Sequence, residues 1–235
     1  MSAKSVLKEL ESLGSEGTRK ILMRHDAREP LFGVKVGDLK KIQKRIGVDH
    51  QLALDLYDTC NYDAMYLACL IADDKKMTKA QLRKWARQAY GGSLSGATVP
   101  WVATGSPQGW DLALEWIDSP KDTISAIGWT TLSSIATVWP DNTLELPAWQ
   151  KLLRSVKKEI HKAPNDTRYA MNGFVIAAGS GISDLFAEAL SIAEAIGEVY
   201  VDHGETSCQT PFAPDYLRKV QSMNRIGKKK KTAKC

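Results

Sequence analysis

The chain has 235 residues, of which 43% are hydrophobic and 25% charged, a composition typical of a folded protein with a sizeable core. It contains no run of about 18 apolar residues and no apolar signal-peptide core, so neither a membrane span nor export is expected. The four cysteines are dispersed without a C-x-x-C pair, which indicates reduced thiols, and we expect a cytoplasmic protein.

The positive charge is concentrated at the C-terminus. The last eight residues, KKKKTAKC, hold five of the lysines behind the formal net charge of +5, and the rest of the chain has 27 basic and 27 acidic residues. We therefore expect a neutral folded body over residues 1–220 and a basic flexible tail over residues 221–235. A flexible polycation favours polyphosphate partners such as nucleic acid, although a solubilising terminus has the same composition.

Helix start and stop signals recur in the first half of the chain. Thr78 followed by Gln81 fits a capping box, and Gly91–Gly92 is expected to end the helix that follows. Ser106–Pro107 and Ser119–Pro120 each place an N-cap residue before a proline at the first helical position. These signals predict short helices joined by short loops.

The second half continues this pattern. Pro147 is expected to open a helix, and Asn165 is expected to cap the next one. Apolar residues between positions 182 and 196 fall on one helical face, which Gly197 ends. The one β-like run is EVYVD, residues 198–202.

The predicted helices form pairs at intervals of roughly 30–45 residues, a spacing compatible with HEAT-like repeats. The fold class expected is therefore all-α, an α-α superhelix of HEAT/ARM-like repeats in a single domain over residues 1–220. A plain helical bundle is the structural alternative.

Several segments together resemble the DNA alkylation repair family of HEAT-like-repeat proteins. They are PLFGVKVGDLKKIQKRI (30–46), NYDAMYLACLIADD (61–74), VPWVATGS (99–106), YAMNGFVIAAGSG (169–181) and GEVYVDHGETSCQTPFAPDYLRK (197–219). The resemblance covers roughly residues 20–220, and P-x-F-G-V before a basic helix is its most characteristic feature. It implies a C-shaped helical solenoid whose basic concave face binds duplex DNA along its backbone.

The resemblance also implies an activity, from which this sequence departs. Active members excise N3- and N7-alkylated purines with an aspartate beside tryptophans, in a motif like Trp-Trp-Asp-x-Val-Asp, helped by an arginine and a later tryptophan. Here Ala97 and Pro100 stand at the carboxylate positions. Trp129 is kept, but Thr131 stands at the arginine, and the later tryptophan is missing from NGFVIAAGS.

The loss of the carboxylate bears directly on the chemistry. Breaking an N-glycosidic bond develops positive charge on the sugar, which a carboxylate can stabilise while it orients the attacking water. Asp111, on the following helix, is the candidate for a displaced catalytic acid, and its other interpretation is a first-turn residue that favours the helix dipole. Standard glycosylase activity is therefore not expected.

The predicted DNA contacts are cations that recur in successive helical pairs, together with two tryptophans. Each cluster alone also fits a solvated helix face, and Trp101 fits a core anchor as well as a stacking residue. Alignment of equivalent positions in a solenoid favours the DNA interpretation, through backbone shape rather than base sequence. The residues are Arg24, Lys35, Lys40, Lys41, Lys44, Arg45, Trp101, Trp129, Lys157, Lys158, Lys162, Arg168, Lys228, Lys229, Lys230 and Lys231.

The loop over residues 202–211, DHGETSCQTP, has two interpretations. It forms either a hydrogen-bonded cap on the C-terminal repeat, which we favour, or a site of its own that includes His203 and Cys208. A zinc site built from Asp202, His203 and Cys208 is not favoured by their spacing, and no metal or cofactor is expected.

We expect a monomeric DNA-binding protein of this family that recognises duplex, branched or damaged DNA and does not associate with membranes. The enzyme alternative is an alkylpurine DNA glycosylase with a displaced acid. The third alternative is a protein-interaction scaffold, since solenoids also bind proteins.

Overall fold

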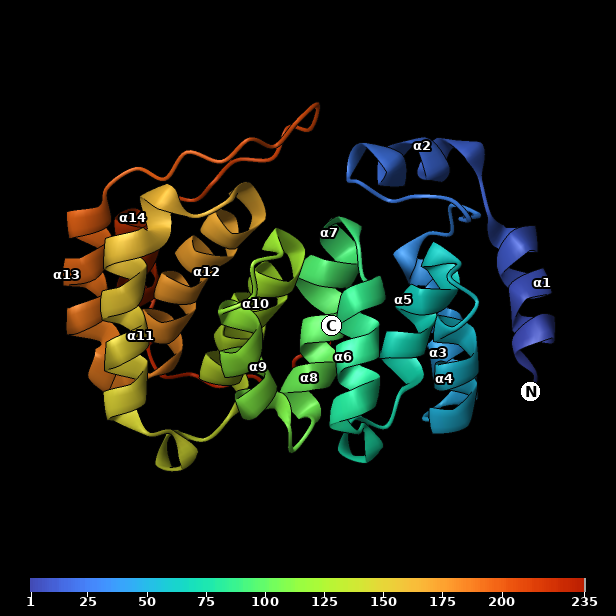
Figure 1. Ribbon diagram of the computed structural model, residues 1–235, viewed down its shortest axis with the longest axis horizontal. Coiled ribbons are helices and arrows are strands. Elements are labelled where there is room, and N and C mark those ends of the chain that lie inside the picture. Colours follow the sequence, from blue (N-terminus) through green and yellow to red (C-terminus); the bar gives the residue numbers. More distant parts are fainter. Residues whose placement is uncertain (235) are drawn as a thin grey trace. The chain divides into compact units, whose positions relative to one another are not determined.

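The computed structural model describes residues 1–234, which fold into helices without a strand (Figure 1). Two compact units are present. Unit 1 comprises Met1–Gln108 with Gly204–Thr206 and Lys234, and unit 2 comprises Gly109–His203 with Ser207–Ala233. The prediction of a single repeat domain over residues 1–220 stays a prediction.

The helices of unit 1 are short and follow one another closely. They are α1 (Ala3–Leu13), α2 (Glu16–Arg24), α3 (Val36–Ile46), α4 (His50–Tyr57), α5 (Tyr62–Ile71), η1 (Asp74–Lys76), α6 (Lys79–Gln88), α7 (Gly91–Ser93), the π-helical turn η2 (Leu94–Thr98) and α8 (Val99–Gly105). All ten residues of α5 are buried, because it packs against α1, α3, α4 and α8. Beside it, the rings of Tyr57 and Trp85 stack with their centroids 4.1 Å apart.

The helices of unit 2 include the two longest of the described residues. They are α9 (Gly109–Ile117), α10 (Asp122–Val138), η3 (Asp141–Thr143), α11 (Leu146–Glu159), η4 (Ile160–Lys162), α12 (Asn165–Gly181), η5 (Ser183–Leu185), α13 (Phe186–Ile196) and α14 (Ala213–Ser222). The core centres on α10 and α12, where Phe174 contacts the rings of Trp129 and Trp149.

Glycines permit the close packing of α10. A Cβ atom on Gly181 would lie 2.3 Å from the carbonyl oxygen of Ala136, and one on Gly128 would lie 2.7 Å from the backbone nitrogen of Ile117. Because these are backbone atoms that cannot move aside, a larger residue would push α12 or α9 away from α10.

Several local predictions are confirmed. Thr78 and Gln81 form the capping box of α6, and α11 carries Pro147 in its first turn. Gly197, with φ of 70°, ends α13. Gly91–Gly92, in contrast, does not end α6, which already ends at Gln88, and instead begins α7.

Three other boundaries differ from the sequence prediction. The hydroxyl groups of Ser106 and Ser119 accept backbone hydrogen bonds from Gln108 and Lys121, but α9 and α10 begin only at Gly109 and Asp122. Asn165 is the first residue of α12 rather than its cap, since its side chain pairs with the backbone of Asp202.

Residues 198–202 do not form a strand. Their side chains nevertheless alternate, since Val199 and Val201 are each 8% exposed and Tyr200 is 77% exposed. The segment thus buries one face without a strand partner. No single helix among residues 1–234 has the length and apolar character of a bilayer span, and only the bent pair Asn165–Gly181 and Ser183–Ile196 meets that test of length and composition.

Candidate nucleic-acid interface

The uncharged stretch over residues 93–106 is part of the core of unit 1. η2 continues directly into α8, whose first turn holds Pro100. Thr98 and Thr104 are 0% and 1% exposed, and Thr104 donates a 2.8 Å hydrogen bond from its hydroxyl to the carbonyl of Pro100. Pro100 is buried and Ala97 half-buried, so neither position of the expected carboxylates offers an acid or an open surface.

The acid that lies against this stretch belongs to an ion pair. A Cβ atom on Gly105, at the end of α8, would lie 2.3 Å from Oδ2 of Asp74. Lys234 Nζ lies 2.6 Å from Asp74 Oδ1 and donates to the carbonyl of Ala72 at 2.9 Å. Burial raises the pKa of Asp74 to about 6, although the nearby Lys234 ammonium lowers it. This carboxylate is 19% exposed and its role here is structural.

Asp111 is exposed in the first turn of α9. An acid in this position favours the helix dipole, as the sequence suggests. A catalytic role for Asp111 stays a prediction.

A buried aspartate that sequence reasoning missed organises the P-x-F-G-V loop. Asp63 is 1% exposed, and its carboxylate accepts hydrogen bonds from the backbone N–H groups of Phe32, Gly33 and Val34 at 2.7, 3.1 and 2.9 Å. Gly33 has φ of 79°, and a Cβ atom there would lie 2.6 Å from the backbone nitrogen of Arg19. The backbone N–H groups of the motif thus surround the Asp63 carboxylate, and the motif continues directly into α3.

The predicted contacts on α3 form two rows. Lys41 donates to Asp38 at 2.8 Å and lowers the pKa of that carboxyl, and Arg45 pairs with Glu9 at 2.5 Å. Lys40 and Lys44 are exposed, and the structure gives them no ion pair within residues 1–234. Of the α3 cations, the row of Lys40 and Lys44 has the charge that phosphates can neutralise. Arg24 and Lys35 are exposed as well.

In unit 2 the predicted cations differ in how they are engaged. Lys157 and Lys158 are exposed in the last turn of α11, and Lys162 is exposed at the end of η4. Arg168 donates from Nε and Nη2 to the carbonyl of Ala163 and from Nη1 to that of Tyr200. Its guanidinium therefore fixes the backbone and keeps only part of its donor capacity for another partner.

The two tryptophans predicted as DNA contacts are placed differently. Trp101 is half-buried, with the ring of Tyr66 edge-on at 6.4 Å. Trp129 is 3% exposed and packs against Phe174. Its ring is almost fully buried, and a stacking role for Trp129 stays a prediction.

The lysines of the C-terminal segment differ in whether their side chains are engaged in contacts or exposed to solvent. Within unit 2, the backbone N–H groups of Gly227 and Lys230 donate to Ser180 and Thr137 at 2.9 and 2.8 Å. Lys229 is 19% exposed and lies 2.7 Å from Asp141, and it also donates to the carbonyl of Ala136. Residues 227–230 thus contact unit 2 through backbone and side-chain groups, and the flexibility predicted for residues 221–235 stays a prediction. Lys228, Lys230 and Lys231 remain exposed.

The loop after α13 is fastened to one face of α12. Asn165, Arg168 and Asn172 donate to the carbonyls of Asp202, Tyr200 and Pro211, and the ring of Tyr169 meets that of His203 edge-on at 5.4 Å. These α12 residues follow the spacing of one helical face. The contacts fit the favoured interpretation as a cap. No group of three or more His, Cys, Asp or Glu residues within residues 1–234 could hold a metal ion.

The fold and the surface define a class of protein: an all-helical repeat protein with exposed cations in both units and an uncharged stretch in its core. A family model described as "DNA alkylation repair enzyme" matches residues 6–204, and the chain belongs to this family. The family assignment and the all-α, HEAT-like fold class expected from the sequence are both confirmed.

Three relatives cover nearly the whole chain. Two are uncharacterized proteins, Lin0241 of Listeria innocua serovar 6a and Lmo0209 of Listeria monocytogenes serovar 1/2a, each 33% identical over 91% of this chain and 95% of its own length. A solved structure is described as "a new family of proteins related to the HEAT-like repeat DNA glycosylases with affinity for branched DNA structures". It shares 34% identity over 100% of both chains, with a TM-score of 0.92.

Proposed function

We propose that this protein binds branched or damaged duplex DNA through the phosphate backbone and does not excise alkylated bases by the chemistry usual in its family. The observation that carries the proposal is the uncharged, buried stretch over residues 93–106 in a chain of this family. Without a carboxylate, that stretch cannot stabilise the charge that develops on the sugar. Binding is supported by the described affinity of the structural relative for branched DNA.

Exposed cations supply the binding energy in this proposal. Phosphate contacts release counterions, so affinity falls with salt, by a slope of about 0.9 for each neutralised phosphate. The proposed phosphate contacts are lysines that are exposed on helices and have no ion pair within residues 1–234: Lys40, Lys44, Lys157 and Lys158. None of them defines a base-reading element, so recognition follows backbone shape.

The first experiment measures affinity for a four-way junction and a linear duplex over a series of salt concentrations. We expect Lys40→Gln with Lys44→Gln to reduce the salt slope by about 2, because two phosphate contacts are lost. Lys4→Gln with Lys8→Gln on α1 is the matched control, since both residues are exposed and equally spaced, and it should leave the slope unchanged. Absence of DNA binding at low salt would favour a protein-interaction scaffold instead.

The second experiment tests catalysis by following 7-methylguanine release from alkylated duplex. We expect release at the rate of the protein-free reaction. Release above that rate would contradict the proposal. Asp111→Asn would then show whether this acid acts as a displaced catalytic group.

A further inference from the structure

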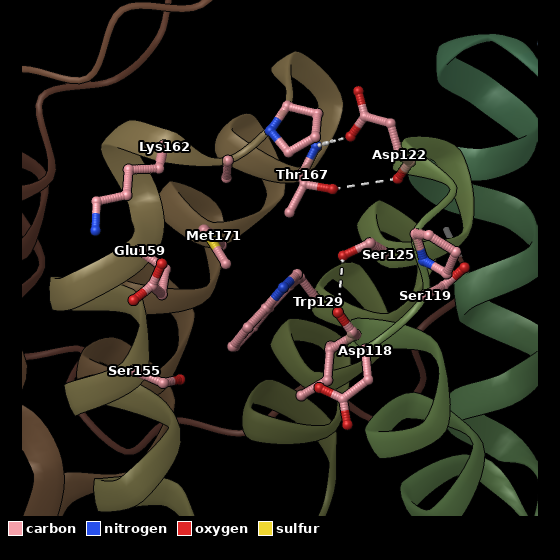
Figure 2. A pocket seen from close by; sticks show the side chains of 14 residues that line it. Asp118, Ser119, Asp122, Ser125, Trp129, Ser155, Glu159, Lys162, Thr167 and Met171 are labelled. Carbon is pink, nitrogen blue, oxygen red and sulfur yellow. Dashed lines mark hydrogen bonds between the residues drawn. The ribbon is translucent and has the colours of Figure 1, made fainter.

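Unit 2 contains a cavity of about 340 Å³ that the proposed function does not use (Figure 2). It lies where four helices end or begin, at the C-terminal ends of α9 and α11 and the N-terminal ends of α10 and α12. Every residue that lines it belongs to unit 2. This space is large enough for a small organic molecule.

The floor of the cavity holds a hydrogen-bond donor without an acceptor. Trp129 is 3% exposed, and its indole Nε1 is buried without a hydrogen-bond partner among residues 1–234. Figure 2 shows the indole in the middle of the lining side chains, with its nitrogen on the edge that faces Thr167 and Met171. An indole nitrogen can only donate, and a buried donor left unpaired is costly. An acceptor in the cavity would remove this cost.

The walls, in contrast, are rich in acceptors. Ser125, Ser155 and Thr167 each donate their hydroxyl hydrogen to a backbone carbonyl, at 3.1, 2.8 and 3.2 Å. What these side chains offer to the cavity is therefore the lone pairs of their oxygens. A molecule that fits these walls needs several O–H or N–H donors.

The mouth of the cavity carries net negative charge. Asp118 and Glu159 line it from opposite sides in Figure 2, and both are exposed without an ion pair within residues 1–234. Asp122 lines it too, with its carboxylate bonded to the backbone N–H groups of Asp166 and Thr167 at 3.0 and 2.7 Å. Lys162 is the one lining cation against these three carboxylates.

We propose that this cavity binds a small amino-polyol, an organic cation with several hydroxyl groups, of the size of an amino sugar. Its ammonium group pairs with a carboxylate at the mouth, Asp118 or Glu159, and its hydroxyl groups donate to the wall oxygens. One hydroxyl oxygen accepts from Trp129 Nε1, which a neutral oxygen does without bringing a second charge into the floor. The inference is independent of DNA binding.

The test uses the full chain and calorimetric titration with glucosamine, with glucose as the neutral match of the same ring. Because hydrogen bonds to charged groups are the stronger kind, we expect glucosamine to bind about tenfold more tightly than glucose. Equal affinities, or no binding of glucosamine at millimolar concentration, would overturn the proposal. In the latter case a structural water alone satisfies Trp129.

Variants locate the site. Asp118→Asn with Glu159→Gln should abolish the tenfold preference for glucosamine, whereas Asp184→Asn with Glu198→Gln changes the charge equally at exposed positions outside the cavity and should keep it. Equal loss in both pairs would contradict the assignment. Trp129→Phe retains a ring against Phe174 and removes the donor, and it should weaken both sugars severalfold. If that variant does not fold, the carboxylate pair still decides the question.

Discussion

Two kinds of polar contact occur in both units and differ between them in burial. In the first device a carboxylate binds backbone N–H groups, and in the second a lysine binds an aspartate and a backbone carbonyl. Asp63 in α5 and Asp122 in α10 each lie in the first turn of a helix and bind backbone N–H groups of a segment distant in sequence. Asp63 is 1% exposed and holds a loop, whereas Asp122 is half-buried and borders a cavity. Such a carboxylate has only a structural role where it is fully buried, and it can also contact a ligand where it is exposed to a cavity.

The second device is a lysine that meets an aspartate and a carbonyl at the C-terminal end of a helix. Lys234 does so at the end of α5 and Lys229 near the end of α10. A cation here also favours the helix dipole. Their acids differ in exposure, since Asp74 is 19% exposed and Asp141 is 47% exposed. The comparison predicts larger effects from the buried member of each pair.

The largest expected effect is that of Asp63→Ala. It would leave three N–H groups of the buried loop without an acceptor, which we expect to lower the free energy of unfolding by about 3 kcal/mol or more. Urea unfolding measures this value. Asp55→Ala, at an exposed position of α4, is the control and should change it by less than about 0.5 kcal/mol. A loss below 1 kcal/mol in Asp63→Ala would break the comparison.

The second prediction concerns pH. The pKa of Asp74 is raised from 3.8 to about 6, so the folded state binds a proton more tightly than the unfolded state does. The stability that this proton provides is full below pH 4 and is lost as pH rises through about 6, by roughly 3 kcal/mol.

The difference in unfolding free energy between the wild type and Asp74→Asn isolates this contribution from those of other carboxylates. We expect the difference to change between pH 4 and 6, where Asp74 titrates, and to be constant above pH 7. The neighbouring charges are Lys234, which lowers the pKa of Asp74, and Asp73, which raises it. A constant difference over the whole range would show that Asp74 keeps an ordinary pKa.

Asp122→Ala ranks third. It removes the acceptor for two N–H groups in the first turn of α12, which we expect to cost about 1–2 kcal/mol, as for the loss of a helix cap. Thermal unfolding followed by circular dichroism measures the change. Asp118→Ala lines the same cavity without capping a helix and should have a smaller effect. An equal loss in both would argue against a capping role.

The smallest expected effect is that of Lys229→Met. Its ion pair with a half-exposed Asp141 contributes less than about 1 kcal/mol, and salt should weaken it further. Unfolding measured in low and high NaCl checks this dependence. Lys230→Met, at an exposed position next to it, should leave stability unchanged in both salts.

The helix starts and ends that could be predicted from the sequence are those set by interactions between neighbouring residues. The capping box of Thr78 and Gln81, the start of α11 with Pro147 in its first turn, and the end of α13 at Gly197 all depend on neighbours within one helical turn. Longer segments of the sequence allowed the family to be recognised, and the resemblance to that family predicted the helical repeat fold.

The devices shared by the two units could not be predicted in this way. The N–H groups that bind Asp63 lie 29–31 residues away, and those that bind Asp122 lie 44–45 residues away, so no local pattern pairs them. For the same reason the sequence predicts Asn165 as the cap of α12, whereas the Asp122 carboxylate accepts the hydrogen bonds of N–H groups in the first turn of that helix. One signal was present: Asp63 is the one charged residue in the apolar helix Tyr62–Ile71, and an isolated charge there requires buried partners.

The ring of N–H groups around the Asp63 carboxylate has a consequence for local dynamics. Residues 32–34 have no regular secondary structure, and loops of this kind usually exchange their amide hydrogens quickly. Here the amides are bonded to a buried carboxylate, so they can exchange only when the N-terminal part of α5 opens. In deuterium labelling, the segment should behave as one of the slowest parts of unit 1, protected as strongly as the helix that holds it.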